Sequence, residues 1–221
     1  MNQRELPASF FKLGLIFGNT FLGRSFDNKA RTGGIGFIVK KEKVPRIVSC
    51  DIISPWIAVL MLQTKQRKTI KIIQVYAPMQ QVEDEEMEHF YEELEEVMQK
   101  RSTYTVIQGD FNAIVGGKES EKEKYVGKFG KGVRNDHRAC LVAFTEVNHL
   151  HTMNTIFQKE DHRHWTWKSL AGVTLNQIDY VMMDTRRTFN DVATIGEQII
   201  FTGSDHYILR SKLCVDNVYE D

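Results

Sequence analysis

The order of apolar segments along this chain restricts the folds that it can form. Four segments rich in isoleucine and valine come first, each bounded by Gly, Pro or charged residues: IGFIV from Ile35, RIVSCDII from Arg46, WIAVLMLQ from Trp56, and IKIIQVYAP from Ile70 to Pro78. Such segments are typical of buried β-strands joined by short connections. We therefore expect these four strands to form a meander.

An amphipathic helix is predicted directly after these strands, from Glu83 to Lys100. Apolar residues recur there at helical spacing, and acids occupy the other face. This pattern predicts a surface helix that covers a sheet, and we interpret its many carboxylates as a solvated face rather than a metal cluster. A second helix is predicted over Asp136 to Leu150, with Asp136 as its N-cap.

The remaining apolar segments predict further strands in TYTVIQGDF, WTWKS, NQIDYVMMD and YILRSKLCV. No internal repeat or interdomain linker separates these elements, so we expect one domain. Its predicted class is α/β (α+β), a two-sheet β-sandwich flanked by helices. Between the last strand of the first half and the second helix, a polar segment rich in Gly and Lys runs from Gly116 to Asp136. This loop is either functional, through phosphate contacts, or simply mobile.

Composition limits the partners that the chain can have. Lys plus Arg equals Asp plus Glu at 29 each, so binding of nucleic acid must come from a local patch. Cys50, Cys140 and Cys214 are odd in number and distant in sequence, which argues against a disulfide framework or a zinc site and favours a reducing compartment. The longest apolar run, Trp56 to Leu62, is too short to span a bilayer, so we expect no membrane partner.

Polar residues interrupt the strands at two places. Asp110 and Asn112 follow an apolar strand, and alternation would place both on one face with Phe111 directed into the core. This arrangement is typical of a site at the carboxyl end of a strand. Asp, Asn and Gly also favour turns for backbone reasons alone, so a simple turn is the alternative.

The second interruption is in the C-terminal part of the chain. Asp179 lies within an apolar strand, and a buried carboxylate requires a partner that offsets its desolvation. His206, just before the last strand, is the candidate, because a carboxylate bound to one imidazole nitrogen fixes the tautomer and leaves the other nitrogen for chemistry.

The ordered motifs VYAP, GDFNA, NQIDYV and GSDH resemble those of the endonuclease/exonuclease/phosphatase superfamily. The sequences of the segments QVYAP, VIQGDFNA, RHWTWKS and TGSDHYILRSKL are similar to those of endonuclease domains from LINE-type retrotransposons of the RTE clade. The resemblance covers Phe21 to Leu213 and implies a deoxyribonuclease I-like fold. It also implies phosphodiester hydrolysis that depends on Mg²⁺, with Mn²⁺ as a substitute.

The resemblance assigns catalytic roles to several of these residues. Asp110 and Asn112 would orient the attacking water and hold phosphate oxygens. Asp179 would orient His206, which would contact the scissile phosphate either as a base or as an electrostatic stabiliser. Tyr76 would donate to the phosphate or stabilise the leaving side.

Metal and substrate contacts follow from the same resemblance. Asp205 would lie at the divalent metal, together with Asp110. Trp165 and Trp167 alternate around Thr166 and would share one face, either lining a DNA-facing pocket or packing in the core. Lys131 and Arg134 are the candidates for phosphate contacts in the polar loop. The segment DHRH from Asp161 to His164 is interpreted as a solvated turn.

One departure from the family pattern concerns the start of the chain. The family has an opening strand-helix-strand unit whose second strand ends in a metal-binding Glu, and none of Glu5, Asp27, Glu42 and Asp51 stands in that context. We therefore expect the fold to lack this unit. Residues 1–19 are left unassigned, 20–214 form the predicted domain, and 215–221 form a tail.

Two functional hypotheses result. The first is a DNA endonuclease of retroelement origin that nicks one strand by metal-dependent hydrolysis, impaired by the loss of the Glu. The alternative is an inactive remnant that binds nucleic acid or protein. A phosphatase acting on other phosphoesters is a third reading, ranked below both. We expect no small-molecule cofactor and an intracellular location, in the nucleus if DNA is the substrate; the sequence leaves the oligomeric state open.

Overall fold

A mixed sheet of six strands forms the centre of the protein. The computed structural model describes residues 19–24, 35–64, 66–79, 84–134, 137–195 and 204–214. In spatial order the sheet contains β3 (Ile47–Ile52), β4 (Ile57–Gln63), β5 (Thr69–Tyr76), β6 (Tyr104–Asp110), β10 (Asp179–Met183) and β7 (His151–Thr152). Only the β5–β6 pair is parallel among these neighbours, and helix α1 (Asp84–Gln99) connects its two strands.

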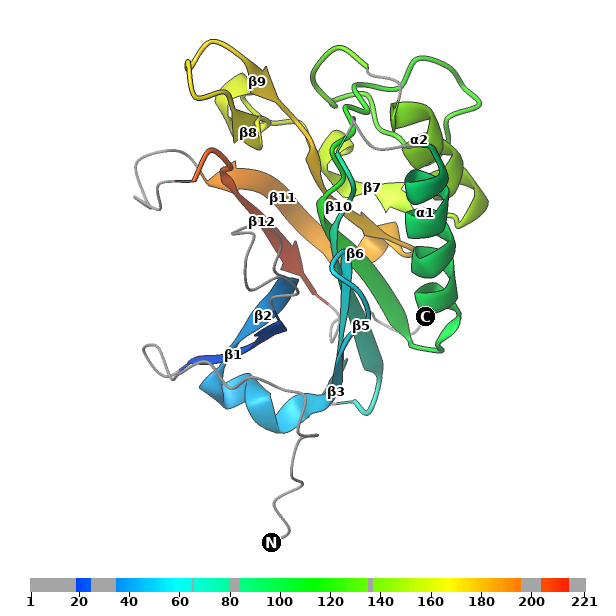
Figure 1. Ribbon diagram of the computed structural model, residues 1–221, viewed down its shortest axis with the longest axis vertical. Helices are drawn as coiled ribbons and strands as arrows, with labels where there is room; N and C mark the ends of the chain where they lie inside the picture. Colours follow the sequence, from blue (N-terminus) through cyan, green and yellow to red (C-terminus); the bar gives the residue numbers. More distant parts are fainter. Residues whose placement is uncertain are drawn as a thin grey trace, which may run out of the picture.

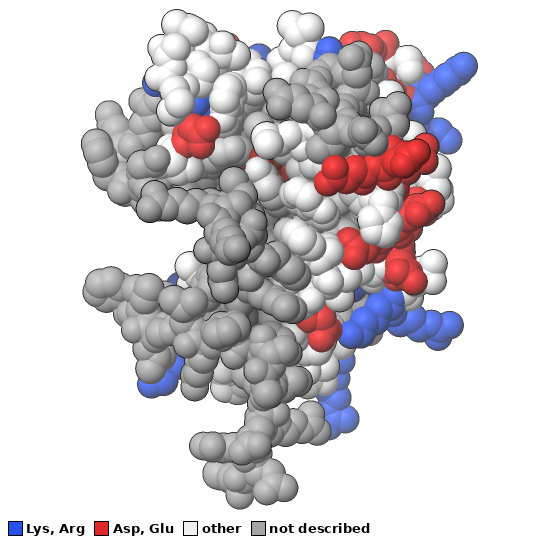
Figure 2. Space-filling model, in the orientation of Figure 1, with Lys and Arg blue, Asp and Glu red and all other residues white. Residues whose placement is uncertain are grey.

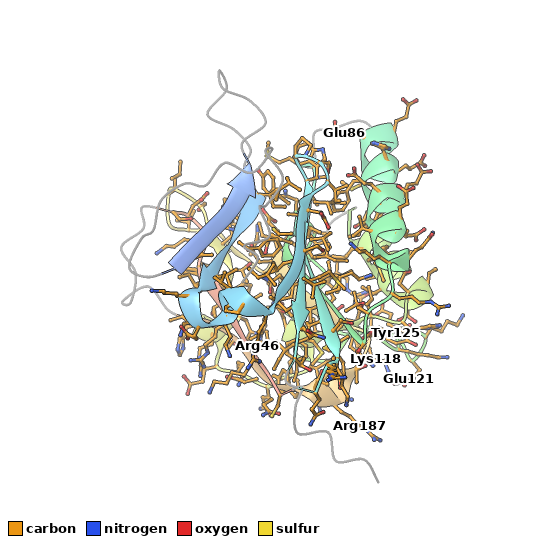
Figure 3. The ribbon with its side chains drawn as sticks, turned by 90° about the horizontal axis from the view of Figure 1, so that it is seen from below. Arg46, Glu86, Lys118, Glu121, Tyr125 and Arg187 are labelled. Carbon is orange, nitrogen blue, oxygen red and sulfur yellow. The ribbon has the colours of Figure 1, made fainter. Side chains whose placement is uncertain are left out.

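The molecule has three layers, with the sheet in the middle (Figure 1; Figure 3 shows the same layers from below). Helices α1 and α2 (His137–Val147) cover one face. Two antiparallel hairpins cover the other: β1 (Asn19–Arg24) with β2 (Ile35–Lys40), and β11 (Phe189–Ile195) with β12 (Ile208–Leu213). A short hairpin of β8 (Trp167–Lys168) and β9 (Leu175–Asn176) lies beyond the start of β12.

Alternation along the central strands divides the core into three clusters. On β4, Ile57 and Val59 face the helices, whereas Ala58 and Leu60 pack beneath the β1–β2 hairpin. On β10, Val181 faces the β11–β12 hairpin, and its neighbours on either side face the helices. This period of two is the reason that one strand can contribute to two cores.

The structure confirms the mixed α/β class, but two separate hairpins, β1–β2 and β11–β12, stand in place of the second sheet of the predicted sandwich. Several details also differ. The predicted meander contains three strands, not four, because β2 pairs with β1 and reaches β3 through a 3-10 helix, Lys41–Arg46. Strand β11 was not predicted, since FNDVATI mixes polar residues into its pattern. Helix α2 ends at Val147, short of the predicted Leu150, and the proposed cap Asp136 lies outside the described residues.

Two predicted loops can also be compared with the structure. The Gly- and Lys-rich loop is held to the body by backbone bonds, including Phe129 N to Thr155 O at 2.9 Å. The DHRH segment contains a 3-10 turn, Asp161–Arg163, but His164 is buried and its Nε2 contacts Lys159 O at 3.1 Å, so only the first part is a solvated turn.

The surface agrees with the interpretation of the acidic helix. The exposed acids of α1 gather on one side of the molecule in Figure 2 and are Glu85, Glu86, Glu88, Glu92, Glu95 and Glu96. Cys50, Cys140 and Cys214 are free thiols. Neither helix in the described part of the chain is long and apolar enough to cross a membrane.

Candidate active site

Three neighbouring strands place Tyr76, Asp110 and Asp179 side by side. The parallel strands β5 and β6 end together, so Tyr76 pairs with Asp110, and β10 begins at the same level with Asp179 opposite Asp110. Their strand neighbours Val75 and Tyr180 belong to the helix-side core, which directs this row toward the hairpin layer. The sheet thus presents an edge of polar side chains at this end.

Gly109 allows β5 and β6 to approach one another at this level. Its φ is 141°, and a Cβ atom added there would lie 1.9 Å from the carbonyl oxygen of Val75 on the neighbouring strand. Any side chain would therefore push β5 away from β6, next to Asp110.

Asp110 and Asn112 form a turn as well as part of the polar edge. The strand ends at Asp110, and Asn112 has a left-handed φ of 48°. Asn112 donates its backbone N–H to Asp110 Oδ1 and its side-chain Nδ2 to Ala77 O, both at 2.8 Å. Phe111 is buried in the core as predicted. The two interpretations of this motif are therefore compatible, although strand alternation does not extend to Asn112.

His206 connects the hairpin layer to this edge. Its Nδ1 is 3.0 Å from Asp179 Oδ2, and its Nε2 is 3.8 Å from Asp110 Oδ2. The first distance is a hydrogen bond, whereas the second is too long for one. Asp179 therefore orients the ring so that Nε2 and the Asp110 carboxylate face the same small volume.

Electrostatic interactions in the site shift three pKa values upward. Burial, reinforced by the nearby Asp179 carboxylate, raises the pKa of Asp110 to about 7. The hydrogen bond with Asp179 raises the pKa of His206 against the effect of burial. Burial and the charges of Asp110 and Asp205 raise the pKa of Tyr76, so its phenol keeps its proton. The site thus concentrates negative charge in a partly buried place.

Asp205 is held by strand β8. The indole Nε1 of Trp167 donates to Asp205 Oδ2 at 2.8 Å. The backbone N–H of Lys168 donates to Asp205 O at 2.9 Å. Asp205 is close enough to Asp110 and Tyr76 to raise both of their pKa values, so it belongs to the same cluster.

The other predicted substrate contacts are placed differently. Trp165 is half-buried. Lys131 forms an ion pair with Asp161 at 2.7 Å, and its backbone N–H donates to Gln177 Oε1. Arg134 is mostly buried and pairs with Glu119 and Glu123, so its charge is compensated within the loop and is not brought to the polar edge.

Sequence reasoning missed the buried polar residues that support this arrangement. Thr166 Oγ1 accepts hydrogen bonds from the N–H groups of Ile178 and Asp179, at 2.9 and 3.0 Å. Asn154 donates to Asp179 O and accepts from Val181 N, each at 2.9 Å. Asn154 lies in a segment without a clear apolar period, and alternation in WTWKS drew attention to the two tryptophans rather than to the threonine between them.

Candidate metal ligands are few in the described residues. Of the acids that precede α1, Glu42 is exposed, Asp51 pairs with Lys100 at 3.4 Å, and Glu5 and Asp27 lie outside the described residues. No group of three or more His, Cys, Asp or Glu in the part that the structure describes is arranged to hold an ion. The oxygen donors and clustered negative charge do suit Mg²⁺, which is commonly bound by one or two carboxylates with water and substrate phosphates.

The described chain has a fold similar to that of several solved structures, as its resemblance to the endonuclease/exonuclease/phosphatase superfamily implies. An AP endonuclease from Leishmania major aligns with a TM-score of 0.61 and 13% identity, covering 89% of this chain and 71% of the other. A 3′ phosphatase from Neisseria, bound to a product DNA hairpin, aligns at 0.57 with 16% identity over 82% and 75% of the two chains. D. rerio TDP2, complexed with single-strand DNA product, aligns at 0.53 with 15% identity over 86% and 74%.

Sequence similarity then identifies particular relatives. The chain is similar to craniofacial development protein 2, with 32% identity over 184 residues to the proteins of Bos taurus and Tragulus javanicus. The match covers 82% of this chain but 31% and 32% of those relatives, so the chain spans about a third of their length. No protein-family model matches the chain.

Proposed function

We propose that this protein hydrolyses phosphodiester bonds of DNA in a reaction that requires a divalent metal. The observation that carries the proposal is the contact of His206 with Asp179 on one side and its approach to Asp110 on the other. The aligned 3′ phosphatase and TDP2 structures, both solved with product DNA, support DNA as the substrate. The sequences of the motifs support an origin in the endonuclease domain of a retroelement. We therefore expect the protein to nick one strand of duplex DNA.

Asp110 is suited to accept the proton of the attacking water. With a pKa of about 7, it is partly ionised at neutral pH and still basic enough to accept a proton. The water oxygen forms a bond to phosphorus and its proton passes to Asp110 Oδ2. The bond from phosphorus to the leaving oxygen breaks, and this oxygen keeps the bonding electron pair and takes a proton from solvent. The N–H of Asn112 holds the other carboxylate oxygen and so fixes the direction of Oδ2.

His206 is suited to stabilise charge rather than to act as the base. Its hydrogen bond with Asp179 favours the protonated ring, and an imidazolium beside the phosphate offsets the charge that develops during displacement. Tyr76 keeps its proton and can donate it in a hydrogen bond to a phosphate oxygen. Both residues therefore act on the phosphate, and Asp110 acts on the water.

Asp205 is the residue that we assign to Mg²⁺ or Mn²⁺. The motif resemblance supports Asp205 as the principal protein ligand, with Asp110 as a second oxygen donor. The metal would neutralise phosphate charge and orient the substrate. Because few carboxylates converge here, we expect the protein alone to bind the metal weakly and the substrate phosphates to strengthen this binding.

Nicking of supercoiled plasmid tests this function. We expect conversion to the open circle with Mg²⁺ or Mn²⁺ but not with EDTA, and a rate at least about 100-fold lower for His206→Ala. His162→Ala is the matched control, since His162 is an exposed histidine outside the site, and it should nick normally. Equal rates for the unmodified protein and His206→Ala would contradict the proposal. Mg²⁺-independent DNA binding without nicking would favour the inactive binding module.

A further inference from the structure

Strand β8 holds the segment that carries Asp205 and His206 through both backbone and side chain. Trp167 forms an antiparallel bridge with His206, and Tyr207 N–H donates to Thr166 O at 2.8 Å. Trp167 then adds its own side-chain bond, from the indole N–H to Asp205 Oδ2 at 2.8 Å. Three consecutive residues, Thr166 to Lys168, thus pair with the segment from Asp205 to Tyr207.

The same strand region is also tied to the sheet. Thr166 is fully buried, and its hydroxyl oxygen accepts from the N–H of Asp179, the residue that orients His206. β8 therefore fixes the position of Asp205 and His206, which precede β12, relative to Asp179 at the start of β10. The contact between Trp167 and Asp205 is the side-chain part of this connection.

The chemistry of an indole suits the task of holding a metal-binding carboxylate. Indole N–H is a neutral donor with no acceptor, so it fixes one carboxylate oxygen without cancelling the negative charge. A lysine or arginine in the same place would neutralise the charge and compete with a cation. Groups that orient metal ligands in this way typically change metal affinity 10–100-fold when they are removed.

We propose that Trp167 is a positioning residue for Asp205 and sets the affinity of the site for a divalent metal. This role rests on the proposed function, and it replaces the substrate contact that the motif resemblance implies for Trp167. The indole is half-buried, and its single polar atom is already used by Asp205.

Mn²⁺ binding to the full chain without DNA tests this role directly. Free Mn²⁺ measured by electron paramagnetic resonance gives a dissociation constant that does not depend on activity. We expect Trp167→Phe, which keeps an aromatic ring but removes the N–H, to raise this constant 10–100-fold. Trp165→Phe is the matched control, because it makes the same chemical change two residues away, and its constant should stay within about twofold of the unmodified protein.

Three further measurements separate the possible outcomes. Asp205→Asn should weaken Mn²⁺ binding at least as much as Trp167→Phe, and Trp167→His, which restores an N–H donor, should recover part of the affinity. In the nicking assay, Trp167→Phe should raise the Mg²⁺ concentration for half-maximal rate while the rate at saturating Mg²⁺ stays close to that of the unmodified protein.

Two results would overturn the proposal in distinguishable ways. Normal Mn²⁺ affinity in Trp167→Phe, together with weaker DNA binding, would assign Trp167 to the substrate and leave the proposed function standing. Failure of the unmodified protein both to bind Mn²⁺ and to nick DNA would overturn the metal-dependent function and this role with it.

Discussion

The two faces of the central sheet are covered in different ways. On one face, α1 and α2 enclose a large apolar cluster that includes Ile57 and Val59 of β4. On the other face, two separate hairpins cover the sheet, and β12 has no buried residue along Ile208–Leu213. We infer that the helix side carries most of the stability, since burial of apolar area is the main favourable contribution to folding.

The candidate site takes residues from both regions. Tyr76, Asp110 and Asp179 stand on strands that are packed against the helices, whereas Asp205 and His206 precede β12 in the hairpin layer. Catalysis requires precise relative positions of these groups. The few contacts between the two layers should therefore affect activity more than they affect stability. The bonds of Trp167 and Thr166 are such contacts.

Truncation of one aliphatic side chain in each region is the strongest test of this contrast. Ile73 is fully buried in the helix-side cluster, and Ile73→Ala should lower the free energy of unfolding by about 4 kcal/mol. Leu209 of β12 is only partly buried against its cluster, and Leu209→Ala should cost about 1 kcal/mol. Urea denaturation of both variants measures the difference. Equal losses would show that the hairpin layer contributes as much stability as the helix side.

The sequence allowed the central region to be predicted better than the hairpin layer. The Ile- and Val-rich strands around α1 have regular periods, so β4, β5, β6 and α1 were found close to their observed bounds. Asp179 was recognised because a carboxylate within an apolar strand requires a partner, and the structure has it bonded to His206. The local sequence is sufficient here because a buried carboxylate by itself implies that a partner such as His206 is nearby.

The remaining features depend on contacts between distant segments. β8 contains only two residues, and its pairing with the Asp205 segment has no local pattern. Lys71 shows the same difficulty in the core, because a lysine between isoleucines is normally exposed but here is fully buried. Its ammonium group donates to the carbonyls of Val97, Met98 and Lys100 at the end of α1, at 3.1, 2.7 and 2.6 Å.

Replacement of Lys71 should show how strongly the sheet is joined to its helix. Lys71→Met keeps the alkyl chain but leaves the last carbonyls of α1 without their donor, which should cost about 3 kcal/mol. Lys100→Met is the control, since the exposed Lys100–Asp51 pair at 3.4 Å should contribute less than about 1 kcal/mol. Thermal and urea unfolding of the two variants would compare these values. A loss for Lys71→Met no larger than that of the control would mean that solvent replaces the ammonium without cost.

The smallest predicted effect is the pH-dependent loss of folding stability caused by the buried Asp110 carboxylate. The pKa of Asp110 is about 7 in the folded protein and close to 3.8 in the unfolded chain. Between these values the folded state binds more protons, so its stability falls as the pH rises from about 4 to about 7. Asp110→Asn removes this loss and keeps an oxygen that can accept from Asn112 N–H. Measured in EDTA, the variant should therefore gain stability relative to the unmodified protein, reaching on the order of 2 kcal/mol above pH 7.

The control for this last prediction is a carboxylate with the opposite shift. A hydrogen bond with Lys131 lowers the pKa of Asp161, so Asp161→Asn should show no gain in stability with rising pH. A variant Asp110→Asn that is more stable but inactive would mean that the Asp110 carboxylate destabilises the sheet. The sheet would then keep this charge because hydrolysis requires a base at that position. A flat difference between pH 4 and pH 8 would mean instead that the His206 ring already offsets this charge, and that the contact between the two layers stabilises both.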